Sequence, residues 1–378
     1  MKRILVTAAA VLICTSSFAQ KIVKGEIENA PQHETYQPTF RSDGSKKAPK
    51  NIILMIGDGT GLGQIASGYY ANGGKLTVTN LKAWGWVTTQ SADDFTTDSA
   101  ASGTAYACGI KTKNYTVGLD ADGNPAPNIP EIVSEKGIIS GVLSTDDLNG
   151  ATPASFFAHQ KNRGMTAEIW GDLPSSKLTF WSAGSQEQFA AQSAETRAAI
   201  MENFTVVKDL NDPVAASAER LGYLPTAVQS GYIKDGRTDY LPTTTRYALR
   251  FLKERCARRK GFFIMIEGAR IDKASHANVY DSMVLEMLDF DQAIEEAIRF
   301  ADEDGETLVI ISADHETGGA TLTGGDPAKG NVNGLFVSDW HTPSPVPIFA
   351  YGPHSQDFMG IQGNDEVAQK IIKLLLGK

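Results

Sequence analysis

The sequence predicts an α/β fold, a three-layer arrangement in which a largely parallel central sheet is covered by helices on both faces. Short apolar runs have the composition of buried parallel strands, and they span residues 51–57, 138–143, 262–266, 307–311 and 347–351. Helical patterns alternate with these runs at residues 100–109, 129–136, 153–162, 241–258, 279–302 and 364–376. Regular alternation of strand and helix is typical of this fold class.

Two segments interrupt this alternation and are predicted to be insertions near one end of the sheet. Residues 164–240 combine scattered aromatic side chains with polar helical stretches, and residues 318–338 are rich in glycine turn signals. Residues 20–50 are polar and rich in Pro, Lys and Gln, which predicts an irregular N-terminal arm. Residues 51–378 then form one domain that contains the 164–240 insertion.

The N-terminus, residues 1–19, has the pattern of a Sec signal peptide, with a basic start, a short apolar stretch and a small-residue end at Ala19. This pattern predicts export to the periplasm or the exterior. Cys14 offers the alternative of a lipidated N-terminus, although Val-Leu-Ile before it is a poor match for a lipoprotein signal. The apolar stretch is too short for a membrane span, and no later segment is long and apolar enough for one.

The bulk composition narrows the class of protein. With 378 residues, of which 42% are hydrophobic, the chain can bury a large core. A net charge of −9 argues against a nucleic-acid partner, because there is no basic excess to neutralise phosphates. Signal cleavage would leave Cys108 and Cys256, which are predicted to be buried thiols.

Acidic and histidine residues gather where the predicted strands end. In an open α/β sheet, ligands bind at the carboxyl ends of the strands, so these side chains are expected to meet at one edge. Asp58 follows the predicted strand 51–57. Glu267, Asp272 and His276 follow strand 262–266, and Asp314 and His315 follow strand 307–311. His341 precedes strand 347–351.

Four carboxylates at one edge need cations nearby, because like charges repel strongly when they are partly desolvated. The basic side chains at hand, Arg163 and Lys273, are too few. Imidazole with carboxylate ligands suits Zn²⁺, and all-oxygen ligands suit Mg²⁺. Taken one at a time, the same residues are explained as well by helix caps, ion pairs or a core histidine. Together they predict a metal cluster.

The stretch TTDSAASGT, residues 96–104, places a hydroxyl beside a carboxylate at the start of a predicted helix. Asp98 is a good N-cap residue, and small side chains follow it. Ser99 then lies in the first helical turn, where unpaired N–H groups and the helix dipole favour an anion. A capped, tightly packed helix without chemistry explains this stretch alone at least as well.

Three motifs resemble those of the alkaline phosphatases, and the resemblance covers nearly the whole chain from Asn51 onward. They are TDSAAS at 97–102, with GIKT at 109–112 behind it, EGARIDKASH at 267–276, and ADHE at 313–316. The resemblance implies hydrolysis of small phosphomonoesters, with Ser99 as the nucleophile that becomes phosphorylated and Arg163 gripping the phosphate. It also implies the homodimer that is common in the family. A phosphodiesterase of the same superfamily is the alternative.

The resemblance also implies two Zn²⁺ ions and one Mg²⁺ ion. Three sets of residues match the metal sites of the family: Asp272, His276 and His341 for the first zinc; Asp58, Asp314 and His315, together with Ser99, for the second; and Asp58, Thr152 and Glu267 for magnesium.

The chain departs from the best-known bacterial pattern near the expected phosphate site. Gly150 stands where that pattern has an Asp, so the usual Asp–Lys pairing is expected to be broken and Lys273 to be free to reach phosphate. The insertion before His341 is also short, which predicts an open site. The sulfatases share the fold, but their motif Cys-x-Pro-x-Arg does not occur here.

Overall fold

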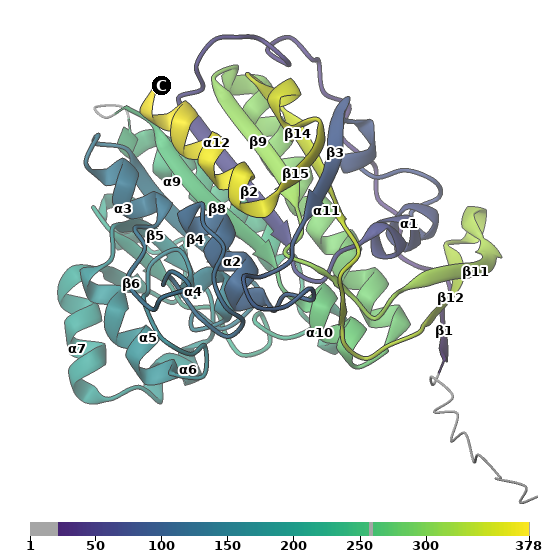
Figure 1. The fold of residues 1–378 in the computed structure, drawn as a ribbon, viewed down its shortest axis with the longest axis horizontal. Helices are drawn as coiled ribbons and strands as arrows, with labels where there is room; N and C mark the ends of the chain where they lie inside the picture. Colours follow the sequence, from purple (N-terminus) through teal and green to yellow (C-terminus); the bar gives the residue numbers. More distant parts are fainter. Residues whose placement is uncertain (1–21, 257–259, 378) are drawn as a thin grey trace, which may run out of the picture.

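The fold is organised around one large sheet (Figure 1). The computed structural model describes residues 22–256 and 260–377. In spatial order the strands of this sheet are β15 (Gly360–Gly363), β3 (Ala83–Thr88), β14 (Val346–Tyr351), β9 (Thr307–Ser312), β2 (Asn51–Gly57), β8 (Phe262–Gly268), β4 (Ile139–Ser144), β5 (Leu178–Ser182), β7 (Leu221–Tyr223) and β6 (Thr205–Val207). Only β14 runs antiparallel to its neighbours among these strands. The largely parallel sheet predicted from the sequence is therefore confirmed.

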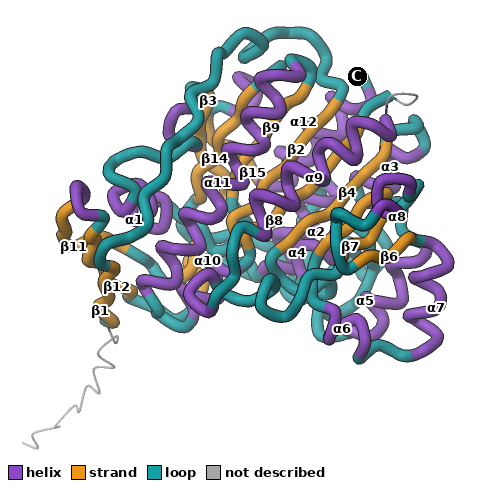
Figure 2. Tube along the Cα trace, turned by 180° about the vertical axis from the view of Figure 1, so that it is seen from behind, coloured by secondary structure: helices purple, strands orange, loops and turns teal. Residues whose placement is uncertain are grey.

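Helices cover both faces of this sheet and complete the three layers. They are α1 (Leu62–Ala71), α2 (Ser99–Cys108), α3 (Ile129–Ser134), α4 (Ala151–Ala154), α5 (Thr166–Asp172), α6 (Gln186–Ala190), α7 (Ala194–Asn203), α8 (Pro213–Ser217), α9 (Tyr240–Arg255), α10 (Arg270–His276), α11 (Tyr280–Asp304) and α12 (Asn364–Leu376). Alternate residues of β2 point to opposite faces: Ile53 and Met55 pack with α9 and α11, and Ile52 and Leu54 with α2 and α12. Figure 1 shows α2 and α12 in front of the sheet, and Figure 2 shows α9 and α11 on the other face.

Most of the predicted elements are present. The apolar runs form β2, β4, β8, β9 and β14, and all but one of the helical patterns form α2, α3, α9, α11 and α12. Strands β3 and β15 are not predicted, since their sequences, AWGWVT and GIQG, contain glycine, which is depleted in strands.

The helix predicted at residues 153–162 is wrong. The short α4 ends early because Val117 and Gln160 form a backbone bridge, with N–H···O distances of 3.0 and 2.8 Å. Arg163 N–H then donates to Tyr115 O at 2.8 Å. Pairing with a segment distant in sequence overrides the local helical pattern here, and it directs the chain so that Arg163 lies beside the loop that follows α2.

The N-terminal segment, expected to be irregular over residues 20–50, contains a strand. β1 (Val23–Ile27) pairs antiparallel with β12 (Asn331–Phe336), which also pairs antiparallel with β11 (Thr321–Asp326). The glycine-rich 318–338 segment therefore folds as a hairpin, and β1 completes a three-stranded sheet with it. No local pattern marks β1, because its partner lies at the other end of the chain.

The 164–240 segment extends the central sheet as well as packing at its end. Its strands β5, β7 and β6 continue the sheet beyond β4, and β5 pairs directly with β4. Its aromatic residues belong to the core: Trp170 and Trp181 are buried, with an edge-to-face contact at 6.3 Å between ring centroids. The division of the chain into arm, domain and insertion stays a prediction.

The predicted signal peptide, residues 1–19, and Cys14 lie outside the described residues, so both stay predictions. None of the described helices combines the length and the apolar character that crossing a membrane requires. Cys108 and Cys256 are buried free thiols, as predicted.

A buried ion-pair network ties the end of the 164–240 segment to α11. The Arg237 guanidinium donates to Glu286 at 2.5 Å and to Asp289 at 2.7 Å, and the three side chains are at most 5% exposed. Burial raises the pKa of Asp289 to about 7, although the charge of Arg237 opposes the shift. The two carboxylates can stay buried because the guanidinium satisfies both of them.

Replacing Arg237 with Met should lower the free energy of unfolding by about 3–5 kcal/mol, because two carboxylates then stay buried without their partner. Arg246→Met is the matched control, since Arg246 pairs with Glu296 at 2.7 Å but is 57% exposed. Its loss should stay below about 1 kcal/mol. Urea unfolding measures both values, and equal losses would contradict the role given to Arg237.

Candidate active site

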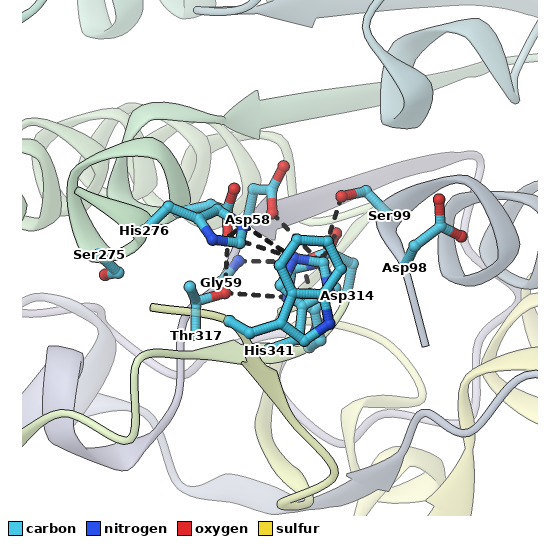
Figure 3. A network of polar contacts seen from close by, with 12 residues as sticks. Asp58, Gly59, Asp98, Ser99, Ser275, His276, Asp314, Thr317 and His341 are labelled. Atoms are coloured by element: carbon cyan, nitrogen blue, oxygen red, sulfur yellow. Dashed lines mark hydrogen bonds and ion pairs between the residues drawn. The ribbon is translucent and has the colours of Figure 1, made fainter. Parts of the chain in front are cut away.

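The carboxyl ends of adjacent parallel strands bring the predicted acids and histidines together (Figure 3). β9, β2 and β8 are neighbours, and Asp314, Asp58 and Glu267 lie at or just beyond their ends. The short α10 follows β8 directly. His341 arrives from outside the main sheet, on a two-stranded ribbon formed by β10 (Glu316–Thr317) and β13 (His341–Thr342).

The first group of side chains consists of Asp272, His276 and His341. α10 is helical, so Asp272 and His276 share one face, and Asp272 Oδ1 lies 3.4 Å from His276 Nε2. His341 Nε2 lies 3.0 Å from His276 Nε2 and 3.8 Å from Asp272 Oδ1. Burial and the charge of His315 lower the pKa of His341 to about 3, which keeps its ring in the neutral form that binds metals. Three ligand atoms at this spacing fit one face of a tetrahedral Zn²⁺ site.

The second group consists of Asp58, Asp314 and His315. His315 Nε2 lies 3.1 Å from Asp314 Oδ2 and 3.7 Å from Asp58 Oδ1. Both oxygens are buried, and neither forms an aligned hydrogen bond with the described residues. The backbone N–H groups of Gly59 and His315 donate to the other Asp314 oxygen at 3.1 and 2.9 Å. Because buried polar atoms normally have a partner, the two oxygens fit a cation bound between them.

All three histidines present Nε2 to the groups, because the protein holds the other ring nitrogen. The contacts of Nδ1 are with Asp339 O at 2.6 Å for His276, Thr97 O at 2.8 Å for His341 and Thr317 Oγ1 at 3.2 Å for His315. Contacts of this kind fix the tautomer and the ring orientation of metal-binding histidines.

Two further predicted ligands, Thr152 and Glu267, are oxygen donors. Glu267 is buried, accepts a hydrogen bond from Ser144 Oγ, and raises the pKa of Asp58 through its charge. The Thr152 hydroxyl is buried and close enough to lower the pKa of Glu267, but it forms no aligned hydrogen bond with the described residues. An all-oxygen set of this kind fits a hard cation such as Mg²⁺.

Burial and mutual repulsion dominate the electrostatics of the carboxyls. Burial, followed by the charge of Asp314, raises the pKa of Asp58 well above its usual range. Burial, followed by the charge of Asp146, raises the pKa of Glu267 to about 8. Burial also opposes ionisation of Asp314, but the charge of the His315 ring, 3.1 Å away, and the backbone N–H of Gly59 bring its pKa to about 2. Bound cations would remove this repulsion, so the carboxyls fit metal ions.

Ser99 opens α2 with its Oγ 3.2 Å from His315 Nε2, beside the second group (Figure 3). Asp98 caps the helix as predicted, because its Oδ1 accepts the Ala101 N–H at 3.0 Å. All ten residues of α2 are buried, and Ser102 Oγ donates to Asp314 O at 2.7 Å. The small side chains thus let the helix pack closely behind the strand-end acids.

Arg163 reaches the head of α2 from the loop after α4. Its Nη1 donates to Asp98 Oδ2 at 3.1 Å, so Asp98 binds Arg163 as well as capping the helix. Burial opposes the charge of Arg163, but the charge of Asp98 outweighs it and raises the pKa of the guanidinium. Asp98 takes one of the five N–H donors, which leaves others to bind an oxyanion as a fork.

Lys273 is paired, which corrects the prediction that it is free to reach phosphate. Its Nζ forms an ion pair and a hydrogen bond with Asp146 Oδ1. Burial raises the pKa of the Asp146 carboxyl, but the charge and hydrogen bond of Lys273 outweigh burial and lower it. The pairing expected to be lost at Gly150 is therefore made by an acid four positions earlier.

Sequence reasoning missed two side chains of the site. Asp146 follows the end of β4, so the rule that found the other strand-end acids also applies to it. Thr317 Oγ1 donates to Asp272 Oδ1 at 2.6 Å and contacts His315. Nothing in the sequence around Thr317 marks it, because its role depends on the ribbon that it forms with His341.

The other histidines belong to neither group, and each has an acidic partner. The pairs are His33 with Asp291, His159 with Glu131, and His354 with Asp357. His159, expected on a helix, lies in the loop after α4, which bends away at the Val117–Gln160 bridge.

Comparisons with known proteins agree with the motifs in this site. The family model described as Alkaline phosphatase matches residues 49–188 and 230–335 of the chain. The chain belongs to the alkaline phosphatase family. It is 32% identical to Alkaline phosphatase H of Pseudomonas aeruginosa, over 84% of this chain and 83% of that protein. Alkaline phosphatase 4 of Bacillus subtilis is 27% identical, over 99% of this chain and 97% of that protein.

Solved structures of alkaline phosphatases share the fold. The alkaline phosphatase of the Antarctic bacterium TAB5 superposes with a TM-score of 0.82 and 38% identity, over 88% of this chain and 99% of that one. A variant of the TAB5 enzyme has been solved with Mg bound. The protein is thus an enzyme of this family, a phosphoric monoester hydrolase with the alkaline phosphatase fold.

Metal-free protein should lose stability as the pH rises from 6.5 to 8. The pKa of Glu267 is raised to about 8 in the folded chain, so in this range the folded chain keeps a proton that the unfolded chain has released. Stability then falls with pH, by at most about 1.4 kcal/mol per pH unit for one such group. Asp58 shifts in the same direction.

Thermal unfolding of chelator-treated protein across this pH range measures the effect. Glu267→Gln is the control, because it removes the titrating group and should flatten the slope. Adding Zn²⁺ and Mg²⁺ to the wild-type protein at pH 8 should restore its stability. A metal-free protein whose stability is constant or rises between pH 6.5 and 8 would contradict the assignment.

Proposed function

We propose that this chain is an exported phosphomonoesterase, periplasmic or secreted, that forms a phosphoserine at Ser99 and releases inorganic phosphate and an alcohol. One observation carries the proposal: Ser99 Oγ lies 3.2 Å from His315 Nε2, while Asp98, the preceding residue, holds the Arg163 guanidinium at 3.1 Å. A nucleophile, a group of metal-type ligands and an anion-binding side chain therefore converge at the head of α2. The fitting substrates are small phosphomonoesters.

The donor sets support two Zn²⁺ ions and one Mg²⁺ ion. The proposed zinc ligands are Asp272, His276 and His341 for one ion and Asp58, Asp314, His315 and Ser99 for the other, with Asp58, Thr152 and Glu267 for magnesium. When bound, such ions lower the pKa of a coordinated hydroxyl or water and supply positive charge for phosphoryl transfer.

Ser99 is the proposed nucleophile. Its hydroxyl proton passes to solvent, Oγ bonds to phosphorus, and the bond from phosphorus to the ester oxygen breaks as that oxygen takes a proton from water. Water then attacks the phosphoserine, and cleavage of the bond between phosphorus and Oγ regenerates Ser99. Asp98 is not the base in this scheme, because its carboxylate is engaged by Ala101 N–H, Tyr115 N–H and Arg163.

Arg163 is proposed to hold two oxygens of the phosphoryl group. A planar guanidinium forms two parallel hydrogen bonds, which a lysine ammonium cannot reproduce. A phosphomonoester carries one more ionisable oxygen than a diester, so a cationic fork beside Ser99 favours the monoester over the alternative phosphodiesterase activity.

Ser99→Ala should remove the phosphoenzyme and lower kcat by at least about a thousandfold, because no other hydroxyl occupies the position. Acid quenching with a ³²P-labelled monoester measures the phosphoenzyme, and elemental analysis should find the zinc content unchanged. Ser102→Ala, one helical turn along, is the control and should still be labelled. Full turnover by Ser99→Ala would exclude the mechanism.

Arg163→Lys should lower kcat/KM for p-nitrophenyl phosphate by about tenfold or more, which corresponds to about 1.4 kcal/mol of transition-state stabilisation. The exposed Arg246→Lys is the control for loss of a guanidinium. An unchanged kcat/KM would refute the role of Arg163.

The wild-type protein should hydrolyse p-nitrophenyl phosphate with a higher kcat/KM than bis(p-nitrophenyl) phosphate, because the guanidinium fork favours the more highly charged monoester. Steady-state kinetics with both substrates measures the ratio. The reverse ranking would favour the phosphodiesterase.

The homodimer stays part of the proposal. Exposed apolar side chains gather beside α1 and β15, where Leu62 and Ile361, 61% and 77% exposed, line one groove with Trp86. Light scattering should give a molar mass of about twice that of one chain, which is 40.6 kDa before the signal peptide is removed. A monomer at micromolar concentration would contradict it.

A further inference from the structure

The ion pair between Lys273 and Asp146 lies at the edge of the proposed site. Lys273 directly follows the ligand Asp272 on α10, and its side chain is 38% exposed, whereas that of Asp146 is 12% exposed. The partly exposed ammonium is thus anchored by a carboxylate that lies deeper in the protein. Because the Asp146 carboxylate is largely buried, it stays in place and holds the Lys273 ammonium near it.

Glycine at position 150 is required by the atoms around it, the Asp146 carboxylate first among them, rather than by its own backbone conformation. Its φ of −54° and ψ of 146° are accessible to any residue, so conformation does not select glycine. A Cβ at this position would overlap the Asp146 carboxylate, and it would also lie 2.9 Å from the Asp147 carbonyl oxygen. Asp146 therefore occupies the space in which a side chain at position 150 would lie, and the two positions depend on each other.

Asp146 also connects the lysine to the proposed magnesium ligands. Its backbone N–H donates to Ser144 Oγ at 2.7 Å, and the same hydroxyl donates to Glu267. The negative charge of Asp146 acts on the other cation of the site as well, since it raises the pKa of Arg163. The carboxylate therefore offsets part of the positive charge of Lys273, with which it pairs directly.

We infer that Asp146 is a positioning residue that anchors Lys273 beside the bound phosphoryl group and limits how tightly the site holds inorganic phosphate, and that the absence of a side chain at Gly150 leaves room for its carboxylate. This inference rests on the proposed phosphatase function and deepens it. A product dianion facing two cations without a compensating carboxylate binds more tightly and leaves more slowly. Asp146 thus sets the balance between binding the substrate and releasing the product.

Asp146→Asn tests the charge at nearly constant shape. In isothermal titration calorimetry of the metal-loaded enzyme, inorganic phosphate should bind about fivefold to tenfold more tightly to this variant. In steady-state assays KM and kcat should both fall, so that kcat/KM changes less than either. Asp147→Asn, the same change of charge one residue along, is the control and should shift phosphate affinity by less than about twofold.

Gly150→Ala tests the shared space. Its methyl group should displace the Asp146 carboxylate and give the same tighter phosphate binding as Asp146→Ala. The double variant should then match either single variant instead of adding their effects. Gly171→Ala is the control, because a Cβ at Gly171 meets no atom within 4 Å.

Unchanged phosphate affinity in Asp146→Asn, or additive effects of Asp146→Ala and Gly150→Ala, would overturn the inference. So would tighter phosphate binding that is accompanied by loss of metal in elemental analysis. Absence of monoesterase activity in the wild-type protein would instead refute the proposed function. The two outcomes can be told apart, because calorimetry measures the effect of Asp146 on phosphate binding and requires no turnover.

Discussion

Carboxylates buried together at the end of a parallel sheet are the constraint on which the rest of this structure depends. Asp58, Glu267 and Asp314 lie at or just beyond the ends of adjacent strands, so the topology that builds the core also forces their charges together. Hydrogen-bond donors of the protein satisfy only some of the carboxylate oxygens. One oxygen each of Asp58 and Asp314 has no aligned donor among the described residues. Bound cations would complete this edge, and the neighbouring histidines present nitrogen atoms that could bind them.

The elements that supply the site are too short to be stable alone. α4 and α10 have four and seven residues, and the ribbon with His341 has two residues in each strand. Isolated helices of this length do not persist in water, so the large sheet and its neighbours hold them in place. Even the loop with Arg163 depends on a bridge to residue 117. The rigidity of the site therefore comes from the sheet rather than from the segments that bear the functional groups.

The parts of the structure that the sequence predicts are those with local causes. β2 and β8 are continuous apolar runs, and the acids that follow them are visible once the strands are placed. The pairing of β1 with β12 and the early end of α4 depend on residues far away in the chain, so no local pattern records them. Only the family resemblance points to Thr152, because the sequence around it is typical of an ordinary helix start. The prediction for Lys273 is wrong because glycine stands at the position of its expected partner; the strand-end rule marks Asp146, but its pairing with Lys273 is visible only in three dimensions.

The histidines differ in what orients them, and this difference sets how each neighbourhood can evolve. Main-chain carbonyls, those of residues 97 and 339, accept the Nδ1–H of His341 and His276. Every amino acid carries the same carbonyl, so substitutions at these two positions leave the orienting contacts intact as long as the backbone keeps its path. His315 instead contacts the Thr317 hydroxyl, which few side chains can replace. Homologous chains should therefore vary more freely at position 339 than at position 317, where a hydroxyl should be retained.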